Sequence, residues 1–98
     1  MKTLHLNLKR KWFDMILSGE KKEEYRDIKP YWTKRFNNFC FETITFSNGY
    51  SKNRDQFEIE VFGLSIKTGL KKWGAEKDKL YFVLILGNIK VPEEEHND

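Results

Sequence analysis

The hydrophobic pattern changes its period within the first part of the chain, and this change restricts the fold more than any other feature. Residues 3–8 alternate apolar and polar, which is typical of a half-buried strand with its three leucines on one face. Residues 9–18 instead repeat apolar side chains at helical spacing, and Gly19 follows where helices commonly turn left-handed and end. Residues 20–27 read as a second strand, now rich in charge. The pattern predicts strand, helix and strand in close succession.

The rest of the chain continues with one short helix and several strands. Pro30 suits the first turn of a helix over residues 31–36, because its missing N–H is not needed there. The alternation in the long strand slips near Val61, which predicts a bulge or bend. Further strands are predicted at residues 39–46, 56–66 and 80–86, with a short closing strand at 89–91. This order predicts an α+β fold, a small mixed β-barrel of about five or six strands with two short helices.

Charge divides the chain into a basic body and an acidic tail. The chain has 98 residues, enough for one domain, which we expect over residues 1–92. Residues 93–98 hold four acidic side chains, and we expect this tail to be disordered. Without the tail, 18 basic residues face 11 acidic ones, a net charge of +7. Such a body suits a polyanion, although lysine-rich surfaces also serve solubility.

Composition argues against several other classes of protein. No apolar run approaches the roughly 18 residues of a membrane span. The first residues lack the long apolar region of a secretion signal, so we expect a cytoplasmic protein. The single cysteine, Cys40, lies between two phenylalanines and is expected to be buried and inert. The sequence contains no Cys/His cluster, so neither a metal nor another cofactor is expected.

The segment Gly19–Arg26 has the spacing G-x-K-x-x-E-x-R and is too charged for a core strand. Lys21 offers a compact charge and Arg26 a planar fork for phosphate or carboxylate. Glu24 can accept hydrogen bonds from the amino edge of a base, or hold Lys21 in place. A partly buried Lys–Glu pair can also shift pKa values enough for proton transfer. The segment therefore predicts a ligand site.

Strand geometry places a condition on this site. Glu24 and Arg26 lie on one face of a regular strand, whereas Lys21 has the opposite parity. Lys21 joins them only if it lies in the turn that enters the strand, or in a bulge. The alternative is an exposed edge strand of a protein-interaction domain, in which Glu24 and Arg26 are solvent-exposed and splayed apart.

The motif and the order of elements resemble the ASCH domain family, which has a PUA-like β-barrel fold. Gly19, Lys21, Glu24 and Arg26 match the four fixed places of the family motif, and the resemblance covers most of residues 3–91. It implies a module that binds RNA or nucleotides in a cleft beside the motif. An RNA- or nucleotide-binding protein is therefore the leading expectation.

The same resemblance implies an alternative, a small metal-free hydrolase. Some members are similar to amidohydrolases that deacylate N4-acylated cytidine with a lysine, a threonine and a glutamate, and others resemble ribonucleases. Lys21 matches the lysine, whereas Glu24 stands in the threonine place. The glutamate of those enzymes follows the long strand, where Glu76 is the nearest residue here. If the protein is an enzyme, Lys21 and Glu24 are the expected catalytic residues, with Glu76 a weaker third.

Four more residues are predicted to contact the ligand. Tyr31 and Trp32 are placed to stack a base at the mouth of the cleft. Asn48 and Tyr50 are placed to present an amide and a ring at its rim. Structural alternatives stand beside both predictions, since Trp32 can pack a helix onto the barrel and Asn48-Gly49 can simply form a hairpin turn.

Overall fold

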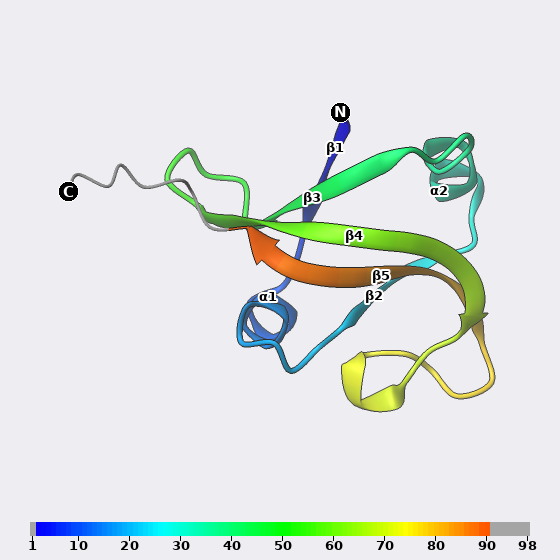
Figure 1. Ribbon diagram of the computed structural model, residues 1–98. Helices are drawn as coiled ribbons and strands as arrows, with labels where there is room; N and C mark the ends of the chain where they lie inside the picture. The colour runs from blue at the N-terminus through cyan, green and yellow to red at the C-terminus, as the bar shows by residue number, and fades with distance from the viewer. Residues whose placement is uncertain (1, 91–98) are drawn as a thin grey trace.

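The computed structural model describes residues 2–90 and shows an α+β fold, a curled sheet of five strands with two short helices (Figure 1). The predicted fold class is thereby confirmed. The predicted acidic tail, residues 93–98, lies outside the described residues. In chain order the elements are β1 (Lys2–Asn7), α1 (Arg10–Leu17), β2 (Glu23–Asp27), α2 (Pro30–Arg35), β3 (Phe41–Asn48), β4 (Asp55–Thr68), the 3-10 helix η1 (Lys71–Trp73) and β5 (Leu80–Lys90).

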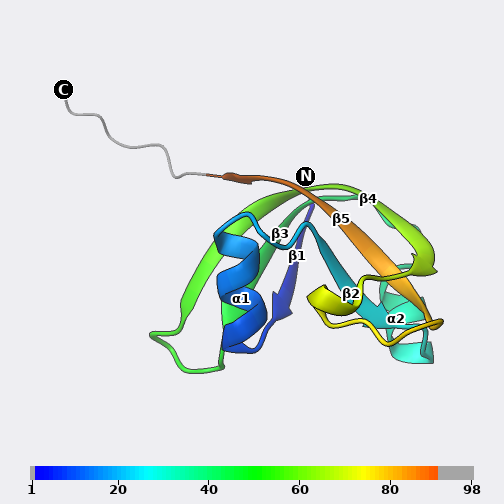
Figure 2. The ribbon, with the colours of Figure 1, turned by 90° about the horizontal axis from the view of Figure 1, so that it is seen from below.

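The sheet is mixed and curls into a half-barrel. Its strand order is β1-β3-β4-β5-β2, with β1 parallel to β3 and the other neighbours antiparallel. The middle strands arch over β1 and β2, which are the two edges, with α1 under one side of the arch and α2 under the other (Figure 2). One hydrogen bond links the two edges, since Arg26 Nη2 on β2 donates to the carbonyl of Asn7 on β1 at 3.2 Å.

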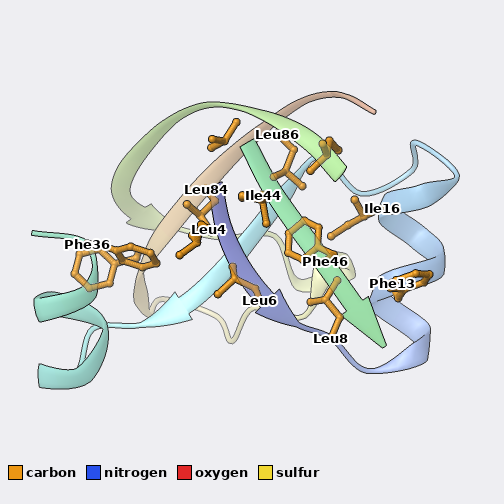
Figure 3. Packing of buried hydrophobic residues seen from close by; sticks show 13 residues of the cluster. Leu4, Leu6, Leu8, Phe13, Ile16, Phe36, Ile44, Phe46, Leu84 and Leu86 are labelled. Carbon is orange, nitrogen blue, oxygen red and sulfur yellow. The ribbon is translucent and has the colours of Figure 1, made fainter. Parts of the chain in front are cut away.

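The core fills the inside of this arch (Figure 3). The leucines of β1 are all buried while His5 between them is exposed, as the alternation predicted. From α1, Phe13 and Ile16 face the same core. Full burial of such a side chain contributes about 1.5–3 kcal/mol, so the helix is held by its apolar face.

The predicted irregularity in the long strand is confirmed. The register between β4 and β5 shifts on either side of Val61, and β4 bends strongly along its length (Figure 1). A bulge adds a residue to one strand and increases the local twist. This bend allows a sheet of only five strands to curl far enough for a side chain of β2 to reach the backbone of β1.

Two local predictions were wrong. Cys40 is exposed, because Phe39 and Phe41 on either side of it pack against the core and the residue between two inward-facing ones points outward. The closing strand at 89–91 is not separate within the described residues, since Ile89 and Lys90 continue β5 and pair with β4. Within residues 2–90, no helix is long and apolar enough to cross a membrane.

Candidate functional site

Lys21 lies in the turn between α1 and β2. Gly19 has a φ of +88°, a left-handed conformation that glycine adopts without strain, and its N–H donates to the carbonyl of Ile16. The chain then folds back along the helix, and the N–H of Lys21 donates to the carbonyl of Met15 at 2.9 Å. β2 begins only at Glu23, so it is shorter than predicted. Because Lys21 lies in the turn before β2, the alternation of the strand does not apply to it. Its side chain can therefore reach Glu24, as the sequence required for a three-residue site.

Glu24 joins a buried cation, Lys21, to a partly buried one, Arg26. Its Oε1 lies 3.1 Å from Lys21 Nζ and its Oε2 lies 2.7 Å from Arg26 Nη2. The side chains of Lys21, Glu24 and Arg26 are only 2%, 7% and 17% exposed. This geometry differs from an exposed edge strand with splayed charges. The structure brings together the three motif residues that the sequence singled out.

The ammonium group of Lys21 has three further neighbours. It donates a hydrogen bond to the carbonyl of Trp73 at 2.7 Å, and it lies 4.8 and 5.0 Å from the ring centroids of Trp12 and Tyr25. Burial lowers the pKa of Lys21, and this effect outweighs the opposite effect of the Glu24 carboxylate. Lys21 therefore loses its proton at a lower pH than a surface lysine does.

Arg26 connects the ion pairs to β1 and α2, and it is not among the residues that line the pocket beside Lys21 and Glu24. Besides Glu24 it contacts the Asn7 carbonyl, and its guanidinium lies 5.1 Å from the Trp32 ring centroid. Its Nε is buried and has no hydrogen-bond partner among the described residues. Trp32 also stacks on Phe36 and packs against the core. Trp32 thus supports Arg26 from α2 and does not line the pocket described next.

A pocket of about 280 Å³ opens beside Lys21 and Glu24. Its lining residues come from α1, the turn after it, β2, the β4–β5 loop and the start of β5. Its aromatic lining residues are Trp12, Tyr25, Trp73 and Tyr81, and its charged ones are Lys21, Glu24, Asp27, Glu76 and Lys79. Glu76 therefore shares a pocket with Lys21 and Glu24, although its side chain is 75% exposed.

The loop between β4 and β5 is held over this pocket by three side chains. Tyr25 Oη accepts a hydrogen bond from the N–H of Leu70, and Tyr81 Oη accepts one from the N–H of Glu76, each at 2.9 Å. The third side chain is that of Lys21, whose ammonium group donates to the carbonyl of Trp73. Burial raises the pKa of Tyr25, whose hydroxyl donates to Glu23 at 2.8 Å. Nothing in the sequence pattern predicted these tyrosine anchors, because their partners are backbone groups of a distant loop.

The remaining predicted ligand residues lie elsewhere. Tyr31 is exposed on α2, and Asn48 donates to the carbonyl of Leu8 at 2.9 Å, which ties β3 to the turn after β1. Tyr50 lines a different pocket, which shares no lining residue with the first. Sequence reasoning placed all of them at one cleft, whereas the structure divides them between two surfaces.

Comparison with known proteins gives no family assignment. No protein-family model matches the chain, and a search of curated proteins finds no match. The similarity to ASCH domains thus rests on the motif and the order of elements. Among the residues that the structure describes, no group of three His, Cys, Asp or Glu side chains is placed to hold a metal ion.

Proposed function

We propose that this protein is an ASCH-like domain that binds the base of a nucleoside, a nucleotide or an RNA strand in the pocket beside Lys21 and Glu24. The observation that carries the proposal is a chain of ion pairs, from buried Lys21 and Glu24 to partly buried Arg26, next to a pocket with aromatic and charged lining residues. The burial of the Lys21 and Glu24 charges is costly for folding, and buried ionisable groups with shifted pKa values beside a pocket are typical of functional sites.

The size and lining of the pocket suit a planar ligand. Its volume of about 280 Å³ is near the lower end of small-molecule sites. The four aromatic side chains offer apolar surface, and stacking on a protein ring contributes about 1–3 kcal/mol per base. A base is therefore a better match for this pocket than an aliphatic ligand.

The polar groups suit the edge of a base. The indole N–H of Trp73 is buried without a hydrogen-bond partner among residues 2–90, so it does not face the open part of the pocket. Glu24, Asp27 and Glu76 supply acceptors for an exocyclic amino group. Three carboxylates against two lysines disfavour a phosphate inside the pocket. A phosphate fits better at the rim, where Lys11 and Lys72 lie 4.7 and 5.2 Å from the rings of Trp12 and Trp73.

A thermal-shift screen of nucleosides, nucleotides and short RNAs tests this proposal. At a concentration ten times its Kd, a base-containing ligand stabilises the folded state by about 1.4 kcal/mol. We expect Tm to rise by roughly 5–10 °C in such a small domain. With nucleosides and nucleotides the rise should disappear in Lys21→Ala and persist in Phe62→Ala, which removes an exposed ring outside the pocket. A screen in which no base-containing ligand raises Tm contradicts the proposal.

A hydrolase is the second candidate, favoured by the lowered pKa of Lys21 beside Glu24 and by the presence of Glu76 in the same pocket. In this function Lys21 acts as base or nucleophile, which requires its neutral form, and Glu24 accepts or returns the proton. Because burial holds the pKa of Lys21 below its ordinary value of 10.5, turnover should rise with pH up to that lowered pKa.

Turnover of N4-acetylcytidine and of RNA over a range of pH tests the hydrolase. We expect Lys21→Ala to abolish the activity and Glu76→Gln to reduce it, with Lys67→Ala, a surface lysine outside the pocket, as the matched control. If turnover is unaffected by Lys21→Ala, this mechanism is rejected while base binding stays open.

A further inference from the structure

A second polar surface lies along the edge strand β1. We define the β1 surface by His5, Tyr31, Arg35, Tyr50 and Arg54, which come from β1, α2 and the loop between β3 and β4. A pocket of about 260 Å³ opens here between β1 and that loop, and His5, Tyr50 and Arg54 are among the residues that line it. This surface is separate from the pocket at Lys21, since the two pockets share no lining residue.

Contacts make the β1 surface continuous from α2 to the loop. Arg35 Nη1 donates to the hydroxyl of Tyr31 at 3.0 Å, and Arg35 Nη2 donates to the carbonyl of His5 at 3.5 Å. His5 in turn lines the pocket with Tyr50 and Arg54. The β1 surface therefore extends along β1 from α2 on one side of the molecule to the β3–β4 loop on the other, with His5 between them (Figure 1).

Two tyrosine rings on this surface are exposed, and of the two only Tyr31 packs against another ring, that of Trp32, with the centroids 4.8 Å apart. Tyr50 is 86% exposed and Tyr31 is 61% exposed. The hairpin that holds Tyr50 depends instead on its neighbours, because Gly49 has a φ of +92° and Asn48 bonds the carbonyl of Leu8. An exposed ring with no structural task is available to stack on a ligand.

The charge of the surface is positive. Arg54 is the only charged side chain that lines this pocket among the described residues, and no carboxylate lines it. Each guanidinium carries five N–H donors, so Arg35 and Arg54 keep free donors after their bonds to Tyr31, His5 and Ser51. Another pocket, over β3, β4 and β5, offers a contrast, since its aromatic Phe62 and basic Lys90 share it with Glu42 and Glu60.

We propose that the β1 surface binds single-stranded nucleic acid, with Tyr31 and Tyr50 stacking bases and Arg35 and Arg54 contacting phosphates. Exposed rings combined with cations and without competing carboxylates are what a flexible strand requires, because every base has a face that stacks and every link carries a charge. A duplex hides its base faces and should bind less tightly. The site stands on its own contacts and does not depend on the pocket at Lys21.

Fluorescence anisotropy with labelled single-stranded RNA and DNA of mixed sequence tests the proposal. We expect Tyr50→Ala to weaken binding roughly 5- to 100-fold. We expect Arg54→Ala to lower the slope of log K against log salt by about 0.7 for each phosphate contact that is lost. Tyr50 is exposed, so its replacement should leave Tm unchanged. The matched control is Phe62→Ala combined with Lys90→Ala, which removes a ring and a cation from the carboxylate-lined pocket.

Separate readouts distinguish this site from the pocket. Lys21→Ala should bind oligonucleotides through the β1 surface, and Tyr50→Ala should still show the thermal shift with a nucleoside. Three results would each overturn the proposal: wild-type protein that binds no oligonucleotide at low salt, binding that Tyr50→Ala and Arg54→Ala leave unchanged, and binding that the control variant weakens as much as they do.

Discussion

Replacement of Glu24 by alanine should lower the free energy of unfolding by about 3–5 kcal/mol, the usual effect of removing one partner from a buried ion pair. Glu24 is the only acidic group that the described residues place within ion-pairing distance of both Lys21 and Arg26. Without it, the buried Lys21 and the partly buried Arg26 have no carboxylate between them. Arg26 cannot lose its proton to escape this repulsion, and Lys21 would have to become neutral.

Urea denaturation of a set of variants measures this effect through the midpoint and the m-value. Lys21→Met should be milder than Glu24→Ala, because Glu24 and Arg26 still form a pair at 2.7 Å. Glu58→Ala is the matched control, since Glu58 is an exposed strand residue and its loss should change stability by no more than about 0.5 kcal/mol. If Glu24→Ala is no less stable than Glu58→Ala, the ion pairs do not hold the site together.

Local patterns were sufficient to predict much of the fold. Alternation in residues 3–8 and helical spacing after it located β1 and α1, and the slip near Val61 located the bulge. Boundaries were less accurate, because the turn after α1 uses residues that the charge pattern assigned to a strand. The error at Cys40 arose from reading its phenylalanine neighbours as evidence of burial, when alternation points it outward.

The candidate site could be predicted from the sequence only in part. Motif spacing identified Lys21, Glu24 and Arg26, which are close in sequence and also in space. The pocket beside them depends on Trp73, which lies 52 residues after Lys21 and contacts it only through a backbone carbonyl. No pattern of side chains records such a contact. For the same reason, the sequence predicted one cleft for the motif, Tyr31 and Tyr50, whereas in the structure the two tyrosines lie outside the pocket beside Lys21.

Replacement of Gly69 by alanine should detach the loop that covers the pocket. A methyl group there would lie 2.6 Å from Cζ of Tyr25 and 2.8 Å from Cβ of Ala75, closer than carbon atoms approach. Its φ lies outside the left-handed region, so the effect is steric and not a matter of backbone strain. Tyr25 must move, which breaks the hydrogen bond from Leu70 to its hydroxyl. Overpacking of this kind costs about 1–3 kcal/mol.

Gly63→Ala provides the matched control for this loop variant, because a methyl group at Gly63 meets no atom within 4 Å. It should fold with unchanged or slightly higher stability. Urea denaturation should separate Gly69→Ala from Gly63→Ala, and hydrogen exchange should show faster exchange at the N–H groups of Leu70 and Glu76 in the first alone. Ligand binding at the pocket should weaken in Gly69→Ala, because the detached loop no longer lines the pocket. Equal stability and equal exchange in the two variants would show that the Tyr25 contact does not hold the loop in place.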